Sequence, residues 1–225
     1  MNGFNSIAID GPAGAGKSSL ARRLSKELGY IYVDTGAIYR SVLAAHRRGL
    51  DTKNEIAVSA MLPEIRIEMR YNDEGEQRMF LDGEDVSAEI RMPEISICAS
   101  NVSAMPAVRA YLLEMQRRMA RTHNVIMDGR DIGTVVLPDA ELKIFLTASA
   151  AARAQRRLLE LQGKSVKADY DEVLRDIEYR DKQDTSRAAA PLKAAEDAVR
   201  VDTTDIDFEQ SAALLRSIVR ERLGV

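Results

Sequence analysis

The chain has 225 residues, of which 45% are hydrophobic and 30% are charged, so it is long enough to bury one core with insertions. Its formal net charge of -3 provides no general attraction to nucleic acid or to an anionic membrane, so any phosphate binding must come from local clusters of arginine. Cys98 is the single cysteine, which excludes an internal disulfide or a cysteine-based zinc site. The sequence shows no signal-peptide pattern and no apolar run of membrane-spanning length, so we expect a cytoplasmic protein.

The predicted secondary structure alternates between strands and helices along most of the chain. Short apolar runs predict strands at residues 6–10, 30–33, 125–128, 142–146 and 198–202. Helical periodicity predicts helices at residues 17–28, 37–48, 106–121, 149–162, 170–187 and 205–222. The alternation predicts an α/β fold in which helices cover both faces of a parallel central sheet.

Two segments interrupt this alternation. Residues 65–70 alternate apolar and charged side chains, residues 72–76 have the composition of a turn, and residues 78–81 are again strand-like. This pattern predicts an antiparallel hairpin inserted into the α/β core. Residues 162–167 join two arginine-rich helices, and we expect them to form a mobile flap. No linker marks an independent second domain.

The first predicted strand and the first predicted helix are joined by a phosphate-binding loop. Residues 11–18 read Gly-Pro-Ala-Gly-Ala-Gly-Lys-Ser, which matches GxxxxGK(S/T). Glycines let successive backbone N–H groups point at phosphates, and the start of the helix adds the positive end of its dipole. We expect Lys17 to reach the β- and γ-phosphates and the hydroxyl of Ser18, or that of Ser19, to bind Mg²⁺. The residues expected to bind ATP or GTP are Gly11, Pro12, Ala13, Gly14, Ala15, Gly16, Lys17, Ser18 and Ser19.

Polar side chains follow two other predicted strands. Asp128 ends the apolar run 125–127, at the carboxyl edge where ligands bind in open α/β sheets, and it is therefore a candidate for holding Mg²⁺. An Asp-Gly pair is also a common turn, but its occurrence together with the phosphate loop favours function. Thr35 follows the run 30–33 and can cap the next helix, while Arg40 lies near enough to bind an anion at the helix start.

Arginines are concentrated in the second half of the chain. Arg153, Arg156 and Arg157 share one face of a predicted helix, and Arg180 and Arg187 flank the end of the next one. Such charges often form only a solvated face. Around a flexible loop, however, guanidinium groups are suited to clamping phosphates bidentately while a closing lid excludes water.

Several segments together resemble the bacterial-type cytidylate kinases. These are residues 11–19, 34–40, 81–87 with 89–91, 128–136, and 180–187 with 191–192. The phosphate loop occurs in many families, whereas Asp-Thr-Gly-Ala-Ile-Tyr-Arg at 34–40 and Asp-Gly-Arg-Asp-Ile-Gly-Thr-Val-Val at 128–136 are far more specific. The resemblance covers essentially the whole chain. It implies an enzyme that transfers the γ-phosphate of ATP to CMP or dCMP. We expect this enzyme to use Mg²⁺ and to be a monomer.

The resemblance also implies a division of the chain and a role for each matching residue. The core would comprise about 1–36, 101–152 and 188–225, the nucleoside-monophosphate-binding insert about 37–100, and the lid about 153–187. By position, the acceptor's phosphate and sugar would lie near Thr35, Arg40 and Arg130, and its cytosine would be read by Ser100, Arg109 and Asp131. The sugar and phosphate would also contact Arg180 and Asp184. Arg187 would join the residues that clamp the phosphate. The expected catalytic set is Lys17, Arg130, Arg157 and Arg187.

The chemistry of the base supports a preference for cytosine. Cytosine presents an N4 donor beside an N3 acceptor, whereas uracil presents an O4 acceptor beside an N3 donor. An ionised Asp131 only accepts and Arg109 only donates, so uracil would leave both mispaired.

Three alternatives compete with this interpretation. A phosphate-loop kinase of UMP, AMP or shikimate is the nearest. A GTPase-type switch is disfavoured because the chain has no Asn-Lys-x-Asp motif. A nucleic-acid-binding module is disfavoured by the acidic balance and by the scarcity of aromatic residues, with four Phe, seven Tyr and no Trp. We therefore expect small-molecule nucleotides as partners, with no nucleic acid and no membrane.

Overall fold

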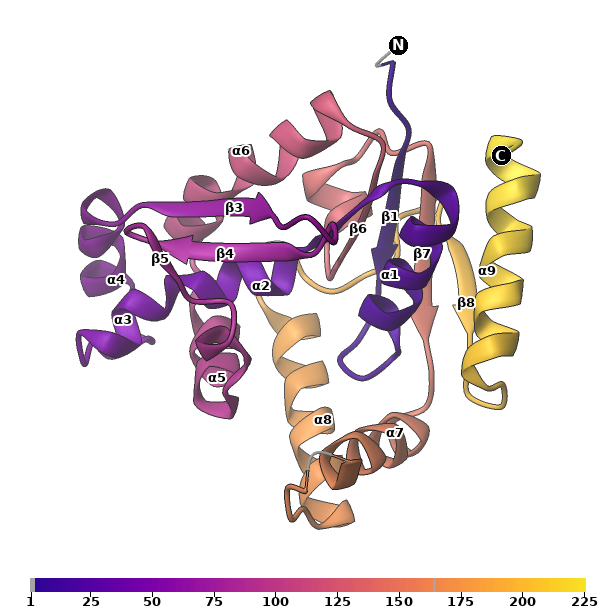
Figure 1. Ribbon diagram of the computed structural model, residues 1–225. Coiled ribbons are helices and arrows are strands. Elements are labelled where there is room, and N and C mark those ends of the chain that lie inside the picture. Colours follow the sequence, from indigo (N-terminus) through magenta and orange to yellow (C-terminus); the bar gives the residue numbers. More distant parts are fainter. Residues whose placement is uncertain (1–2, 164) are drawn as a thin grey trace.

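The computed structural model describes residues 3–163 and 165–225 and has a five-stranded parallel sheet at its centre (Figure 1). The strands are β1 (Ser6–Asp10), β2 (Ile31–Asp34), β6 (Val125–Gly129), β7 (Leu142–Thr147) and β8 (Val199–Asp202). They lie in the order β2-β6-β1-β7-β8, and every neighbouring pair is parallel. The predicted α/β fold is confirmed, and each predicted strand is shifted by no more than one residue at either end.

Helices cover both faces of this sheet because side chains along each strand alternate in direction. Ile7 and Ile9 of β1 pack into the apolar cluster that contains α1 (Lys17–Leu28) and α9 (Phe208–Leu223). Ala8 faces the opposite cluster, which contains α2 (Thr35–Arg40) and α6 (Pro106–Thr122). The sheet is therefore buried on both faces, as its nearly continuous apolar strands require.

Residues 41–102 form a second group of elements on the α2 and α6 side of the sheet (Figure 1). It comprises 3₁₀ turns at Ser41–Leu43, Leu62–Glu64 and Glu89–Arg91, the helices α3 (Ala44–Arg47), α4 (Glu55–Met61) and α5 (Pro93–Val102), and the strands β3 (Ile67–Tyr71), β4 (Gln77–Leu81) and β5 (Glu84–Asp85). The predicted hairpin is confirmed as β3 and β4, with Met69 opposite Met79. Its apolar residues share one continuous core with the central sheet.

Three features of this group depart from the sequence prediction. The single helix predicted over residues 37–48 is wrong, because the chain bends at Val42 (φ -73°, ψ 17°) and divides into α2, a 3₁₀ turn and α3. The short helix α4 and the helix α5 were not predicted. Neither was β5, which pairs with the end of β4 to make a three-stranded antiparallel sheet.

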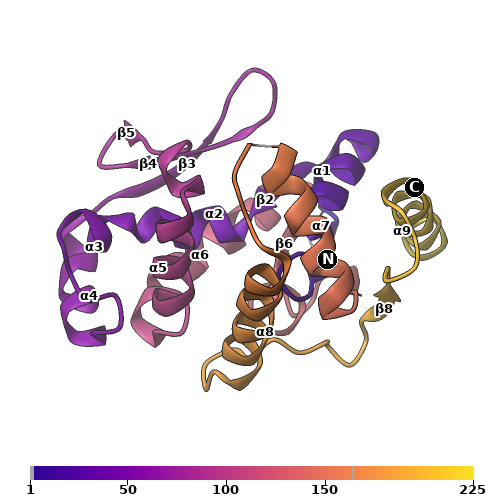
Figure 2. The ribbon, with the colours of Figure 1, turned by 90° about the horizontal axis from the view of Figure 1, so that it is seen from below.

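The helices α7 (Ala150–Gly163) and α8 (Tyr170–Ser186) lie beyond the carboxyl ends of the central strands (Figures 1 and 2). They pack on each other through Ala154, Val173 and Ile177. Of the flap predicted at 162–167, Lys164 lies outside the described residues. A five-residue π-helix at Ile132–Val136 follows β6. In the described part of the chain no helix has the length and apolar character needed to cross a bilayer.

Candidate active site

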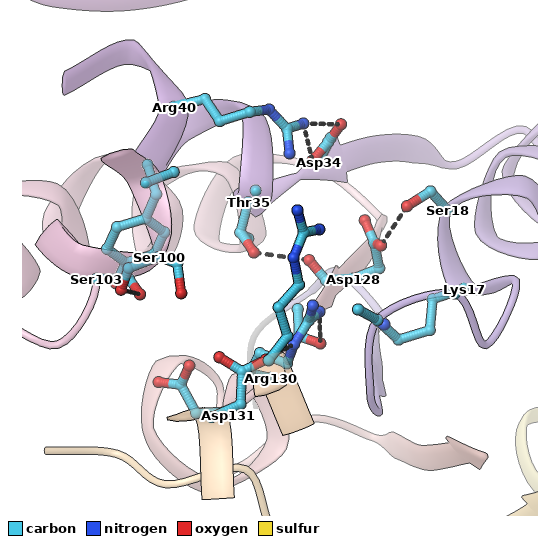
Figure 3. Close-up of a pocket in the computed structure, with 18 of the residues that line it drawn as sticks. Lys17, Ser18, Asp34, Thr35, Arg40, Ser100, Ser103, Asp128, Arg130 and Asp131 are labelled. Atoms are coloured by element: carbon cyan, nitrogen blue, oxygen red, sulfur yellow. Dashed lines mark hydrogen bonds and ion pairs between the residues drawn. The ribbon is translucent and has the colours of Figure 1, made fainter. Parts of the chain in front are cut away.

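A cavity of about 380 Å³ opens at the carboxyl ends of β1, β2 and β6, between α2, α5 and the pair α7 and α8. Fifteen of the predicted site residues line it, namely Ala13, Gly14, Lys17, Ser18, Thr35, Arg40, Ser100, Arg109, Asp128, Arg130, Asp131, Arg157, Arg180, Asp184 and Arg187. Gly11, Pro12, Ala15, Gly16 and Ser19 are not among its lining residues. In the close-up, Lys17 and Ser18 lie on one side, Ser100 and Ser103 on the other, and Arg130 between them (Figure 3).

The phosphate loop approaches the sheet closely. A Cβ atom on Gly11 would lie 1.9 Å from the carbonyl oxygen of Leu146 in β7, so only glycine fits there. Gly16 has a left-handed conformation (φ 87°) that caps α1. Lys17, 5% exposed, donates a hydrogen bond to the carbonyl of Pro12 at 2.7 Å. Burial, together with the positive charge of Arg130, lowers the pKa of Lys17 to about 7, so this ammonium lacks a full set of counter-charges.

A hydroxyl and a carboxylate meet beside this loop. Ser18 Oγ donates to Asp128 Oδ2 at 2.8 Å, and the hydroxyl of Tyr32 donates to Asp128 Oδ1 at 2.9 Å. Burial raises the pKa of Asp128, and the nearby charge of Asp34 raises it further. Ser18 and Asp128 offer two hard oxygen donors side by side, which is the donor type that would hold a Mg²⁺ ion. Among the residues that the structure describes, the Ser19 hydroxyl makes no such hydrogen bond to a carboxylate, which favours Ser18 over Ser19.

Asp34, which sequence reasoning did not select, organises the start of α2. Its carboxylate accepts from Arg40 at 3.2 Å (Figure 3). It also accepts from the backbone N–H of Ala37 at 2.8 Å and from Arg91 at 3.0 Å. Burial raises the pKa of Asp34, but the charges of Arg40 and Arg91 outweigh burial, so its pKa lies below the ordinary value. Thr35 does not cap this helix, because Asp34 does so and Thr35 donates to the carbonyl of Asp128 at 2.7 Å.

The signal for Asp34 was available in the sequence, since Asp34 directly follows the apolar run 31–33 as Asp128 directly follows the apolar run 125–127. Arg91 also lines the cavity, although it lies far from Asp34 in the sequence. The buried Nε of Arg40 has no hydrogen-bond partner among the described residues. An unpartnered guanidinium N–H beside a cavity is a donor available to an anionic ligand.

A second buried cluster surrounds Asp131. Its carboxylate pairs with Arg109 on one oxygen and with Arg187, at 3.2 Å, on the other. Arg109 also donates to the carbonyl of Ser103 at 3.1 Å, which brings α6 against the end of α5. Burial raises the pKa of Asp131 even though the charges of Arg109 and Arg187 oppose that shift. Ser103, which lines the cavity with Ser100, was not predicted.

The remaining arginines separate into cavity-lining and structural groups. Arg130 pairs with Asp184 at 2.6 Å, and Arg157 and Arg180 line the cavity from α7 and α8. Arg153 is instead buried, 4% exposed, where it binds Asp181 at 2.6 Å and the carbonyl of Ala13 at 3.0 Å.

Arg156 donates to the hydroxyl of Thr203 at 3.1 Å and to the carbonyl of the same residue. The interpretation of Arg153, Arg156 and Arg157 as one functional face is therefore wrong, because each finds a different partner.

The cavity carries an excess of positive charge. Eight of its lining residues are basic and five are acidic; they are Lys17, Arg40, Arg91, Arg109, Arg130, Arg157, Arg180 and Arg187, with Asp34, Asp128, Asp131, Glu160 and Asp184. Because the whole chain has a net charge of -3, this excess is local to the cavity. It suits a ligand with several phosphates.

Comparison with known proteins decides the family. A family model described as cytidylate kinase matches residues 7–221. The chain belongs to the cytidylate kinase family. Among curated proteins named cytidylate kinase, that of Lactobacillus johnsonii is 46% identical over 99% of this chain and 96% of its own length. That of Pelotomaculum thermopropionicum is 50% identical over 96% of each chain. A solved shikimate kinase from Bacteroides thetaiotaomicron is 14% identical and covers 96% of this chain and 98% of its own, with a TM-score of 0.46.

Membership of the cytidylate kinase family confirms the resemblance and makes the chain an enzyme that transfers phosphoryl groups. Two of the arginines that the nucleic-acid-binding alternative would use, Arg153 and Arg156, make their hydrogen bonds inside the molecule.

Proposed function

We propose that this protein transfers the γ-phosphate of ATP to CMP or dCMP, giving ADP and the corresponding diphosphate, as cytidylate kinase family membership indicates. At the level of the site, one observation carries the proposal. The buried carboxylate of Asp131, paired with Arg109 and Arg187, lies in the same cavity as the phosphate loop. A carboxylate beside a guanidinium offers an acceptor next to a donor, which complements N4 and N3 of cytosine and opposes the edge of uracil.

ATP would bind through the phosphate loop, with the β- and γ-phosphates beside Lys17. The lowered pKa of Lys17 supports this role, because phosphate oxygens would supply the negative charge that the buried ammonium lacks. Ser18 and Asp128 would hold Mg²⁺. When bound, Mg²⁺ neutralises charge on the β- and γ-phosphate oxygens.

The acceptor would lie across the cavity from this loop. Ser100, Arg109 and Asp131 would contact its cytosine, and Thr35, Arg40 and Arg130 would lie toward its phosphate. The unpartnered Nε of Arg40 supports an anion at this position. Asp184 would accept from a sugar hydroxyl, and because it already pairs with Arg130, sugar binding and phosphate binding are linked through one ion pair.

Phosphoryl transfer demands positioning and charge stabilisation more than covalent chemistry. Lys17 from the loop, Arg130 from the end of β6, and Arg157 and Arg187 from the region of α7 and α8 converge on one cavity. They would stabilise the negative charge on the transferring group. Residues about 153–187 would act as a lid that excludes water, residues about 37–100 as the acceptor-binding insert, and the remainder as the core.

The test is ADP release from MgATP with CMP, dCMP, UMP, AMP, GMP and shikimate supplied separately. The proposal predicts fast turnover with CMP and dCMP and slow turnover with the others. Turnover centred on another acceptor would remove the assignment of Asp131 and Arg109 to the base, and ADP release that is independent of any acceptor would remove the proposal itself.

Three expectations from the sequence extend the proposal. A monomer is tested by light scattering at assay concentrations. The absence of nucleic-acid binding is tested by retention on heparin at moderate salt. A cytoplasmic location is tested by fractionation of the source cells.

A further inference from the structure

Asp10 is a buried carboxylate that the proposed chemistry does not use. It is the last residue of β1, directly before the phosphate loop, and only 4% of its surface is exposed. Its Oδ1 accepts from the backbone N–H of Ile132 at 2.8 Å, and its Oδ2 accepts from the backbone N–H of Gly133 at 2.7 Å. Asp10 is not among the residues lining the cavity. Its carboxylate therefore acts on the segment that follows Asp131.

The two amides need an external acceptor. They belong to the first two residues of the π-helix Ile132–Val136, and the first N–H groups of a helix have no partner within it. Asp131 immediately precedes them with φ -146° and ψ 26°, outside regular helix and strand geometry. A carboxylate at this point satisfies both donors and interacts favourably with the helix dipole. The main chain next to Asp131 is thus fixed by two hydrogen bonds to the carboxylate of Asp10.

We infer that Asp10 is a positioning residue for recognition of the acceptor base, acting through Asp131. This inference rests on the proposed function, in which Asp131 meets the cytosine. Arg109 and Arg187 hold the carboxylate of Asp131 from α6 and from the end of α8, while Asp10 fixes the main chain just after it. With the backbone and the side chain both held, the carboxylate has one orientation before the acceptor arrives. Such preorganisation lowers the cost of binding.

The effect is directed at the acceptor because the main chain of Asp10 is held independently. Asp10 pairs with Gly129 in β6 and with Phe145 in β7 through the parallel ladders. Changing its side chain leaves both ladders in place, so the phosphate loop keeps its starting point. Replacing the carboxylate by an amide would instead leave one of the two N–H groups, that of Ile132 or that of Gly133, without an acceptor.

The variant Asp10→Asn tests the inference, with Glu141→Gln as a matched control. Glu141 also accepts from a main-chain N–H of β1, that of Ser6 at 2.7 Å, but at the opposite end of the strand. For Asp10→Asn we expect the KM for CMP to rise about tenfold and the ratio of kcat/KM for CMP over UMP to fall about tenfold, which is the effect of losing roughly one charge-assisted hydrogen bond. The KM for ATP should change less than the KM for CMP, because Asp10 acts on Lys17 only through a weaker charge interaction and not through a hydrogen bond. Glu141→Gln should change none of these values.

The single variants Asp10→Asn and Asp131→Ala, together with the double variant, separate this inference from the proposed function. If Asp131→Ala alone leaves the CMP to UMP ratio unchanged, the assignment of Asp131 to the base fails and the inference fails with it. If Asp131→Ala abolishes the preference but Asp10→Asn leaves it intact, only the inference is overturned. The inference predicts that adding Asp10→Asn to Asp131→Ala lowers the ratio no further; additive effects would overturn it.

Hydrogen exchange gives a measurement that does not depend on a variant folding. The inference predicts that the amides of Ile132 and Gly133 exchange slowly in the unliganded wild-type enzyme, at rates comparable with those of β1 and β6. Rapid exchange that slows only when CMP is added would overturn it, because the segment would then be ordered by the acceptor and not by Asp10.

Discussion

Replacement of Asp131 by alanine should weaken recognition of cytosine far more than it weakens use of ATP. The side chain of Asp131 is only 6% exposed, and its two partners, Arg109 and Arg187, are 11% and 7% exposed. Alanine removes the acceptor for N4 of cytosine, a charge-assisted hydrogen bond of about 1.5–3 kcal/mol, so kcat/KM for CMP should fall roughly 10- to 150-fold. UMP loses only an unfavourable contact between O4 and the carboxylate, so its kcat/KM should stay the same or rise.

The same substitution should also destabilise the protein. Breaking a buried ion pair from one side costs about 3–5 kcal/mol, which corresponds to a fall in Tm of roughly 6–20 °C for a protein of this size. A coupled assay of ADP release at a temperature well below the lowered Tm separates the two effects. Asp197→Ala is the control, because Asp197 also pairs with a basic residue, Lys143, but its side chain is 64% exposed. If the ratio of kcat/KM for CMP over UMP in Asp131→Ala stays within threefold of the wild-type value, Asp131 does not read the cytosine.

Three further predictions concern the phosphate loop and α7. Lys17→Met should abolish transfer while the protein stays folded. Because burial lowers the folded-state pKa of Lys17 from 10.5 to about 7, the free energy of unfolding of the wild type should increase as pH rises from 7 to 10.5. Lys17→Met should lack this increase, which urea titrations at several pH values measure. Near-normal transfer in that variant would contradict the role of Lys17. Gly11→Ala should fail to yield folded protein, since its Cβ would lie 1.9 Å from a carbonyl oxygen of β7. Gly163→Ala should fold normally by circular dichroism, because apart from its chain neighbours no described residue has an atom within 4 Å of the added Cβ. Arg153→Ala should lower Tm strongly because Arg153 forms a buried ion pair. Arg157→Ala should lower kcat with Tm unchanged, because the Arg157 side chain lines the cavity and is 41% exposed. The opposite pattern would contradict a structural role for Arg153 and a catalytic role for Arg157.

The sequence predicts the central sheet well because its strands are buried on both faces. Ile7 to Ile9 and Val125 to Met127 form apolar runs too short for helices, and the segments between them have clear helical periodicity. The short helices were harder to predict. α4 has only seven residues, and the bend at Val42 leaves no mark in the local sequence because it depends on how α2 and α3 pack on the core.

For the site, residue type and strand ends predict which side chains gather, but not how they pair. Asp128 and Lys17 could be located from the strand-loop-helix pattern alone. The helical spacing of Arg153 and Arg157 suggests a common role, yet Arg153 turns inward to Asp181 while Arg157 lines the cavity. Such pairings depend on contacts between residues far apart in the sequence. The contact of Asp10 with residues 132 and 133 is of the same kind, since it spans more than a hundred residues of the chain.

Transfer from ATP to the acceptor is measured by following the phosphoryl group itself. ATP labelled in its γ-phosphate is incubated with Mg²⁺ and an equimolar mixture of CMP and UMP, and the labelled products are separated. The expected result is that the label appears in the terminal phosphate of CDP, with UDP labelled far more slowly, and that Asp131→Ala removes this preference. Label released mainly as inorganic phosphate, or divided equally between CDP and UDP by the wild-type enzyme, would contradict it.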